Sequence, residues 1–216
     1  PFYSELWNKI RNGESLTYSW DIGMGTNFIS LAAYYLASPI NWIIALFPQK
    51  YMIEIMNSLI ILKLSLSSVS FCYYLSEKFN TKRCTLVLFS VFYALSGYVC
   101  AYSWNIMWLD CIALFPLIMV GLSRLVYEGR VGLYYVSLAV SIFANYYISI
   151  MVCIFLVFYF AYLFLFPQGE LRYQRNRTRL SRPVQWRMKA LGRFSLYSIL
   201  AGGTSAVLLL PEIAIL

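Results

Sequence analysis

Apolar runs about as long as the hydrocarbon core of a bilayer is thick recur along this sequence. A helix needs about 20 mostly apolar residues to cross that core. With 61% apolar and only 12% charged residues, the chain has more apolar surface than one soluble core of its size can hide. The sequence therefore predicts an all-α polytopic bundle of about six transmembrane helices, at roughly 53–75, 85–101, 111–126, 131–147, 149–166 and 194–216.

Basic residues gather in alternate connections between these runs. Three lie in 78–83, two in 124–130 and eight in 172–193, which makes 13 of the 17 in the chain. If the six spans alternate, all three connections lie on one side, which the positive-inside rule makes cytoplasmic. The net charge of +8 thus indicates a basic cytoplasmic loop at 168–193 rather than a nucleic-acid partner. This loop either lies on anionic membrane lipids or is solvated.

The first 49 residues are predicted to form an outer segment, and residues 50–216 the transmembrane region. Residues 18–27 contain two glycines and are typical of turns. Two short apolar runs follow, separated by residues 38–42, and we expect interfacial helices there. A single kinked span over 28–47 is the alternative. Because the sequence starts with Pro rather than Met and ends in an apolar run, we expect a piece of a longer chain.

Lys63 is the ionisable residue that most needs an explanation, because it lies near the middle of the first span. At helical spacing it shares a face with Ser67 and Ser70, which predicts that this face points into the bundle. Lys63 either meets a phosphate or sugar in a cavity or is paired structurally. Glu54 lies on the opposite face of the same helix, near its outer end, where a solvated cap residue is the alternative to a site residue.

Two acids on the outer side are candidate site residues. Asp110 is the only acid of its outer loop, and it either caps the following helix or serves as a site carboxylate. Trp104 and Trp108 flank it and either stack on sugar rings or belong to the aromatic belt. Asp21 precedes two glycines that allow a tight turn, which either binds an anion or is a plain turn.

Several classes of site are excluded by residue content. The chain has no histidine, and none of its five cysteines forms a CxxC pair, which argues against a zinc site of Cys and His. No phosphate-binding loop, nucleophile elbow or dinucleotide fingerprint is present. Cys100 and Cys111 flank one predicted outer loop, so a disulfide between them is left open.

Several short motifs follow one another along nearly the whole chain. They are YSW at 18–20, GMGTNF at 23–28, YYLASPINW at 34–42, WNIMWLD at 104–110, LFPLI at 114–118, NYYI at 145–148, CIF at 153–155 and LLP at 209–211. Together, in this order, they resemble the YfhO family of bacterial membrane proteins.

The resemblance implies a GT-C-type membrane glycosyltransferase. Such enzymes take a sugar from a polyprenyl-phosphate carrier and attach it to a cell-envelope polymer on the outer face of the plasma membrane. Lipoteichoic or wall teichoic acid is the implied acceptor. A transporter or flippase for a lipid-linked envelope precursor is the alternative, and a structural subunit is a third hypothesis.

The resemblance also suggests roles for individual residues. The main catalytic acid of such enzymes is expected shortly upstream of Pro1, so this stretch is expected to lack it. Asp21 and Asp110 are then catalytic candidates in a secondary role, holding the acceptor or the sugar. No cofactor is specified, and Mg²⁺ bound by the acids is left open. The substrate-binding candidates, of which the first two could stabilise the leaving phosphate, are Lys63, Lys50, Glu54, Trp104, Asn105, Trp108, Asn145 and Tyr146.

Overall fold

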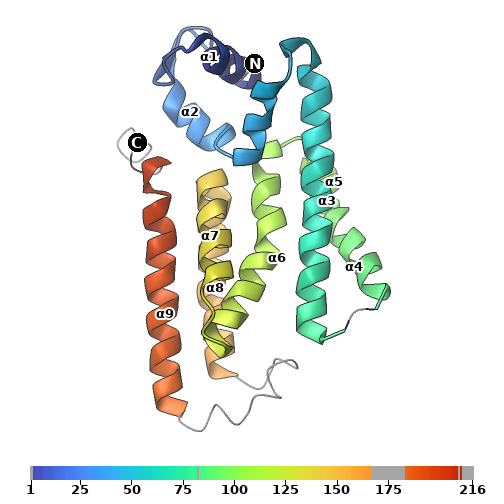
Figure 1. Ribbon diagram of the computed structural model, residues 1–216, viewed down its shortest axis with the longest axis vertical. Coiled ribbons are helices and arrows are strands. Elements are labelled where there is room, and N and C mark those ends of the chain that lie inside the picture. The colour runs from blue at the N-terminus through green and yellow to red at the C-terminus, as the bar shows by residue number, and fades with distance from the viewer. Residues whose placement is uncertain (1, 82, 167–182, 209, 211–216) are drawn as a thin grey trace.

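The structure of the chain is a computed structural model that describes residues 2–81, 83–166, 183–208 and 210. Long helices lie side by side in a bundle, and the N-terminal elements form a smaller layer on one end of it (Figure 1). In chain order, with η marking 3₁₀ helices, the elements are α1 Phe2–Asn12, β1 Tyr18–Ser19, β2 Thr26–Asn27, α2 Phe28–Tyr35, η1 Pro39–Leu46, η2 Gln49–Tyr51, α3 Met52–Phe79, α4 Thr85–Ala94, α5 Gly97–Tyr102, α6 Ile106–Tyr127, α7 Gly132–Ala144, α8 Tyr146–Leu165 and α9 Pro183–Thr204.

The all-α membrane bundle that the sequence predicts is confirmed. Within the described residues, four helical segments are long and apolar enough to cross a membrane. A fifth candidate is α2 with η1, two short apolar helices bent by 109° at their junction, as in a broken span or a re-entrant loop. The predicted total of about six also counts α7, which has only 13 residues, and α9. The four segments are Gln49–Phe79, Thr85–Tyr102, Ile106–Tyr127 and Tyr146–Leu165.

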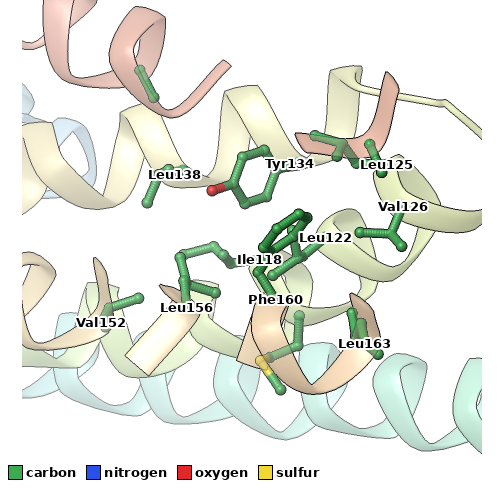
Figure 2. Packing of buried hydrophobic residues seen from close by; sticks show 13 residues of the cluster. Ile118, Leu122, Leu125, Val126, Tyr134, Leu138, Val152, Leu156, Phe160 and Leu163 are labelled. Atoms are coloured by element: carbon green, nitrogen blue, oxygen red, sulfur yellow. The ribbon is translucent and has the colours of Figure 1, made fainter. Parts of the chain in front are cut away.

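Helix α6 is the central helix of the bundle. In its most apolar stretch 67% of the residues are buried, against 33% or less in the other three spans. Its inner face packs against α7, α8 and α9 around the ring of Tyr134 (Figure 2). A Cβ atom on Gly121 would lie 2.6 Å from the backbone N and Cα of Tyr134, so glycine lets α6 and α7 approach closely. The labelled core residues in Figure 2 are Ile118, Leu122, Leu125, Val126, Tyr134, Leu138, Val152, Leu156, Phe160 and Leu163.

The basic residues of the described connections meet at one end of the bundle, opposite α1 (Figure 1). There Arg124 of α6 lies 3.1 Å from Glu77 of α3, and Trp186 of α9 donates a hydrogen bond to the carbonyl of Val126. The helices therefore alternate in direction as the charge pattern predicts.

The last part of the predicted basic loop 168–193 is helical. Helix α9 already begins at Pro183, so the last three basic residues of the stretch are helical. Proline suits the first turn of a helix, and the straight-chain residues that follow it are good helix formers. The rest of the basic loop, residues 167–182, lies outside the described residues.

The layer of N-terminal elements has its own small core, in which Phe28 of α2 packs against Leu6 of α1. Helix α1 was not predicted, although it carries a buried pair, Glu5 and Lys9, that ties it to the strands. Ser19 of β1 donates to the Glu5 carboxylate at 2.6 Å, and Lys9 donates to the carbonyl of Tyr18. These contacts join α1 to β1 and hold the N-terminal layer in a folded state.

The bend between α2 and η1 follows from Pro39. Proline disfavours helical geometry in the residue before it, and Ser38 has a ψ of 125°. The bend faces the bundle, because Asn145 between α7 and α8 donates a hydrogen bond to the carbonyl of Tyr34 at 3.1 Å. The cysteines do not form the disulfide left open above: all five are free, and Cys111 is buried.

Candidate functional site

The buried ammonium of Lys63 is the centre of the candidate site. Its side chain is fully buried, and its Nζ atom lies 2.6 Å from Oδ2 of Asp110. Nζ also donates to Oδ1 of Asn41 at 2.8 Å and to the carbonyl of Ile106 at 3.1 Å. An ammonium has three protons to donate, so all of them are used in this state. The predicted inward face of α3 is confirmed, because Ser67 and Ser70 are buried beside Lys63.

Residues of α3, η1 and α6 meet at this ammonium because α3 and α6 begin at different levels along the bundle axis. Lys63 is about 16 Å along α3, at 1.5 Å per residue, whereas Asp110 lies in the first two turns of α6. The outer end of α3 therefore projects beyond the start of α6. Helix η1 fills this step and brings Asn41 to the level of Lys63.

A cavity of about 420 Å³ lies directly beside the Lys63–Asp110 pair. Most of its wall is apolar and comes from α3, α6 and α7. Ser38, Lys63 and Asp110 are among its lining residues, but these side chains are buried and the accessible wall is almost entirely apolar. Such a wall suits the apolar chain of a lipid. The apolar wall includes Leu66, Val69, Leu114, Leu117 and Val140.

Tyr73 lies on the cavity wall ten residues further along α3, toward the basic end. Its hydroxyl accepts a hydrogen bond from Nη2 of Arg124 at 2.5 Å, and Arg124 also pairs with Glu77. The cavity thus runs between two groups of charged residues, one near each end of the bundle.

The layer of N-terminal elements closes the site from above. Asp110 is only 5% exposed, and Tyr3 of α1 packs with η1 and the first turns of α3. Burial, and to a lesser extent the negative charge of Asp110, raises the pKa of Tyr3 above its ordinary range. Access to Asp110 from the end of the bundle that carries α1 therefore requires α1 and η1 to move.

Two further predicted residues support this cover. Asn145 is fully buried, and its Oδ1 caps α8 by accepting from the amide of Ile148 at 2.9 Å. The ring of Tyr146 lies 5.9 Å from that of Tyr34 in α2. Both residues therefore hold the α2–η1 bend against the bundle. Asn105 is buried just before α6, in the same outer region.

The other predicted residues do not join the Lys63–Asp110 pair. Asp21, Lys50 and Glu54 are exposed, and the Lys50 ammonium lies 4.6 Å from the ring centre of Tyr51. Trp104 is 70% exposed and donates to the carbonyl of Ala101.

Trp108 is half-buried, and its ring packs against Tyr102. Of the two aromatic residues that flank Asp110 in the sequence, only Trp108 therefore turns toward the interior.

Sequence reasoning missed Ser38, Asn41 and Tyr3. The signal for the first two was available, since polar side chains interrupt an apolar run at residues 38–41. Tyr3 gave no such signal, because its place beside Asp110 depends on how α1 folds back over α3.

The site does not fit a divalent metal ion. Within the part of the chain that the structure describes, no three Cys, Asp or Glu side chains cluster closely enough to hold one. Asp110 offers a carboxylate, but the ammonium of Lys63 already occupies the cation position beside it.

Comparison with known proteins identifies one protein family that matches this chain. No curated protein and no solved structure shows a significant match to the chain. The family model described as "Bacterial membrane protein YfhO" matches residues 1–216, which is the whole sequence. The apolar helices of the bundle agree with that description. The chain therefore belongs to the YfhO family of bacterial membrane proteins.

Proposed function

We propose that this protein is a GT-C-type glycosyltransferase that moves a sugar from a polyprenyl-phosphate carrier to a cell-envelope polymer. Lipoteichoic or wall teichoic acid is the proposed acceptor, on the outer face of the bacterial plasma membrane. The supporting observation is the apolar cavity that ends at the buried Lys63–Asp110 pair. A polyprenyl chain matches the apolar wall, and the charged pair supplies the two groups that the reaction needs.

The reaction is a displacement at the anomeric carbon of the sugar. The acceptor hydroxyl oxygen forms the new bond to that carbon, and the bond from carbon to the phosphate oxygen breaks. A carboxylate takes the acceptor proton, and a cation stabilises the departing phosphate. In this proposal Asp110 is the carboxylate, in place of the acid expected upstream of Pro1, and Lys63 is the cation.

The two groups hold each other in the state described here. A phosphate that enters the cavity competes with Asp110 for the ammonium of Lys63, because both are anions with oxygen acceptors. Once the phosphate takes this position, the Asp110 carboxylate is released to accept a proton. Binding of the donor would therefore prepare the base as well as place the sugar.

A deletion strain tests the proposal. Lipoteichoic and wall teichoic acids from the deletion strain should lack a sugar substituent that the wild-type gene restores and an Asp110→Asn gene does not. Mass spectrometry and NMR of the purified polymers measure this, and immunoblotting checks that both proteins accumulate. Unchanged glycans in the deletion strain would contradict the proposal.

A flippase for a lipid-linked precursor is the second candidate, favoured by the 109° bend between α2 and η1. Broken helices often border the binding sites of transporters. The two candidates differ in vitro. The purified protein in liposomes would move a fluorescent polyprenyl-phosphate sugar between leaflets if it is a flippase, whereas an enzyme would cleave it when an acceptor is present.

A further inference from the structure

Two buried hydrogen-bond donors near the start of η1 have no acceptor within the described residues, and one of them belongs to a residue that lines the cavity. They are the hydroxyl of Ser38, in a residue 1% exposed, and the Nδ2 amide of Asn41, in a residue with no exposed surface. A buried donor without a partner destabilises the folded state, because it has lost its hydrogen bonds to water. Two such groups in one bend point to an acceptor supplied by another molecule.

The orientation of Asn41 follows from the charge of its neighbour. An ammonium can only donate, so the amide oxygen of Asn41 must face Nζ of Lys63, which lies 2.8 Å away. The NH₂ group is then the free end of the side chain. Since an amide NH₂ can only donate, the missing partner must carry an acceptor atom.

Ser38 is in the position where a serine normally caps a helix. At the start of a helix, the hydroxyl usually accepts a hydrogen bond from a backbone N–H in the first turn. Ser38 makes no such bond to η1, although it is the cap residue. The residue lines the cavity, together with Lys63 and Asp110. Its unpaired hydroxyl is therefore a candidate donor to a molecule in that cavity.

We infer that Ser38 is a headgroup-binding residue that donates a hydrogen bond to a phosphate oxygen of a lipid whose chain lies along α3 and α6. This inference rests on the proposed function and assigns one residue to the binding of its donor. The apolar wall of the cavity selects an amphiphile over a free anion. Phosphate oxygens accept several hydrogen bonds, so the Ser38 hydroxyl and the Lys63 ammonium can bind one headgroup.

The chain offers a closely matched control in Ser67. Its hydroxyl is also buried without a partner, in a residue 1% exposed on the same face of α3 as Lys63, but it does not line the cavity. Ser38→Ala and Ser67→Ala remove the same atom from similar surroundings. Only the first should change binding.

The test uses the full-length protein in lipid nanodiscs with farnesyl phosphate as the probe. Ser38→Ala should weaken binding of farnesyl phosphate about tenfold, the effect of one hydrogen bond to a charged group, whereas Ser67→Ala should leave it unchanged. Farnesol, which has the chain without the phosphate, should bind more weakly and distinguish the variants less. Inorganic phosphate should compete only at far higher concentrations.

Thermal unfolding separates this role from a structural one. Ser38→Ala removes an unpaired polar group, so the ligand-free protein should unfold at the same or a higher temperature than wild type. A lower unfolding temperature together with weaker binding would indicate a structural role for Ser38 and would overturn the inference.

The other outcomes are equally informative. If wild type binds farnesyl phosphate and Ser38→Ala binds it equally well, the role of Ser38 is wrong while the proposed donor stands. If wild type does not bind farnesyl phosphate, both fail. Equal competition by inorganic phosphate and farnesyl phosphate would overturn the amphiphile as the ligand.

Discussion

The Nζ atom of Lys63 lies 2.6 Å from Oδ2 of Asp110, across 47 positions of sequence. The pair is buried, so each charge depends on the other for compensation. Removing one member of a buried pair is far more destabilising than replacing both by apolar residues. This asymmetry gives the first prediction.

Lys63→Met should lower the free energy of unfolding by about 3–5 kcal/mol, because the Asp110 carboxylate is left buried without its cation. The double variant with Lys63→Met and Asp110→Leu should recover most of that loss. Denaturant-induced unfolding of the two variants in a mild detergent, followed by tryptophan fluorescence, measures their free energies of unfolding. A double variant no more stable than Lys63→Met would show that the pair does not carry this energy.

Asp110→Asn should separate binding from chemistry. The amide oxygen of Asn can still accept from Lys63, but the positive charge is no longer neutralised. Farnesyl phosphate should therefore raise the unfolding temperature of Asp110→Asn more than that of wild type. Sugar transfer by the same variant should fall by about 10²–10⁴, the usual effect of losing a general base. Full transfer activity would remove Asp110 from the reaction.

Gly121→Ala should push α6 and α7 apart. The added methyl group would meet the backbone of Tyr134 at 2.6 Å, and backbone cannot rotate away as a side chain can. We expect a loss of about 1–3 kcal/mol in stability. Gly192→Ala in α9 is the control, because nothing lies within 4 Å of the added atom and alanine favours the helix. Equal effects of the two substitutions would contradict the close approach.

Cysteine labelling should place the two ends of the bundle on opposite sides of the membrane. In a variant whose five native cysteines are replaced, Asp21→Cys should react with a membrane-impermeant maleimide in intact cells. Arg130→Cys, at the basic end, should react only after the membrane is opened. Both native side chains are exposed, so accessibility is comparable. The reverse pattern would invert the proposed orientation.

Several parts of this structure could be predicted from the sequence. The apolar runs predict α3, α6 and α8 to within about five residues, since span length is set by bilayer thickness, but α9 begins eleven residues before the span predicted at 194–216. The inward face of Lys63 follows from its spacing to Ser67 and Ser70. The break at 38–42 follows from Pro39, whose restriction on the preceding residue is local.

The partners of Lys63 could not be predicted in the same way. Helical periodicity shows which face a residue occupies, but the neighbour on that face depends on how far each helix projects. Asp110 and Asn41 reach Lys63 only because α6 starts below the outer end of α3 and η1 fills the step. The buried Glu5–Lys9 pair was missed because charged residues at this spacing usually lie on a solvated face.

The separation of 47 positions between Lys63 and Asp110 also sets an order of events during synthesis. At about 5–20 residues per second, the ribosome needs several seconds after making Lys63 to supply its partner. During that interval α3 enters the membrane with a lone charge, at a cost of about 2.5–3.5 kcal/mol on insertion scales. Helix α3 is therefore expected to stay near the translocon until α6 arrives, and the N-terminal cover can seat only afterwards.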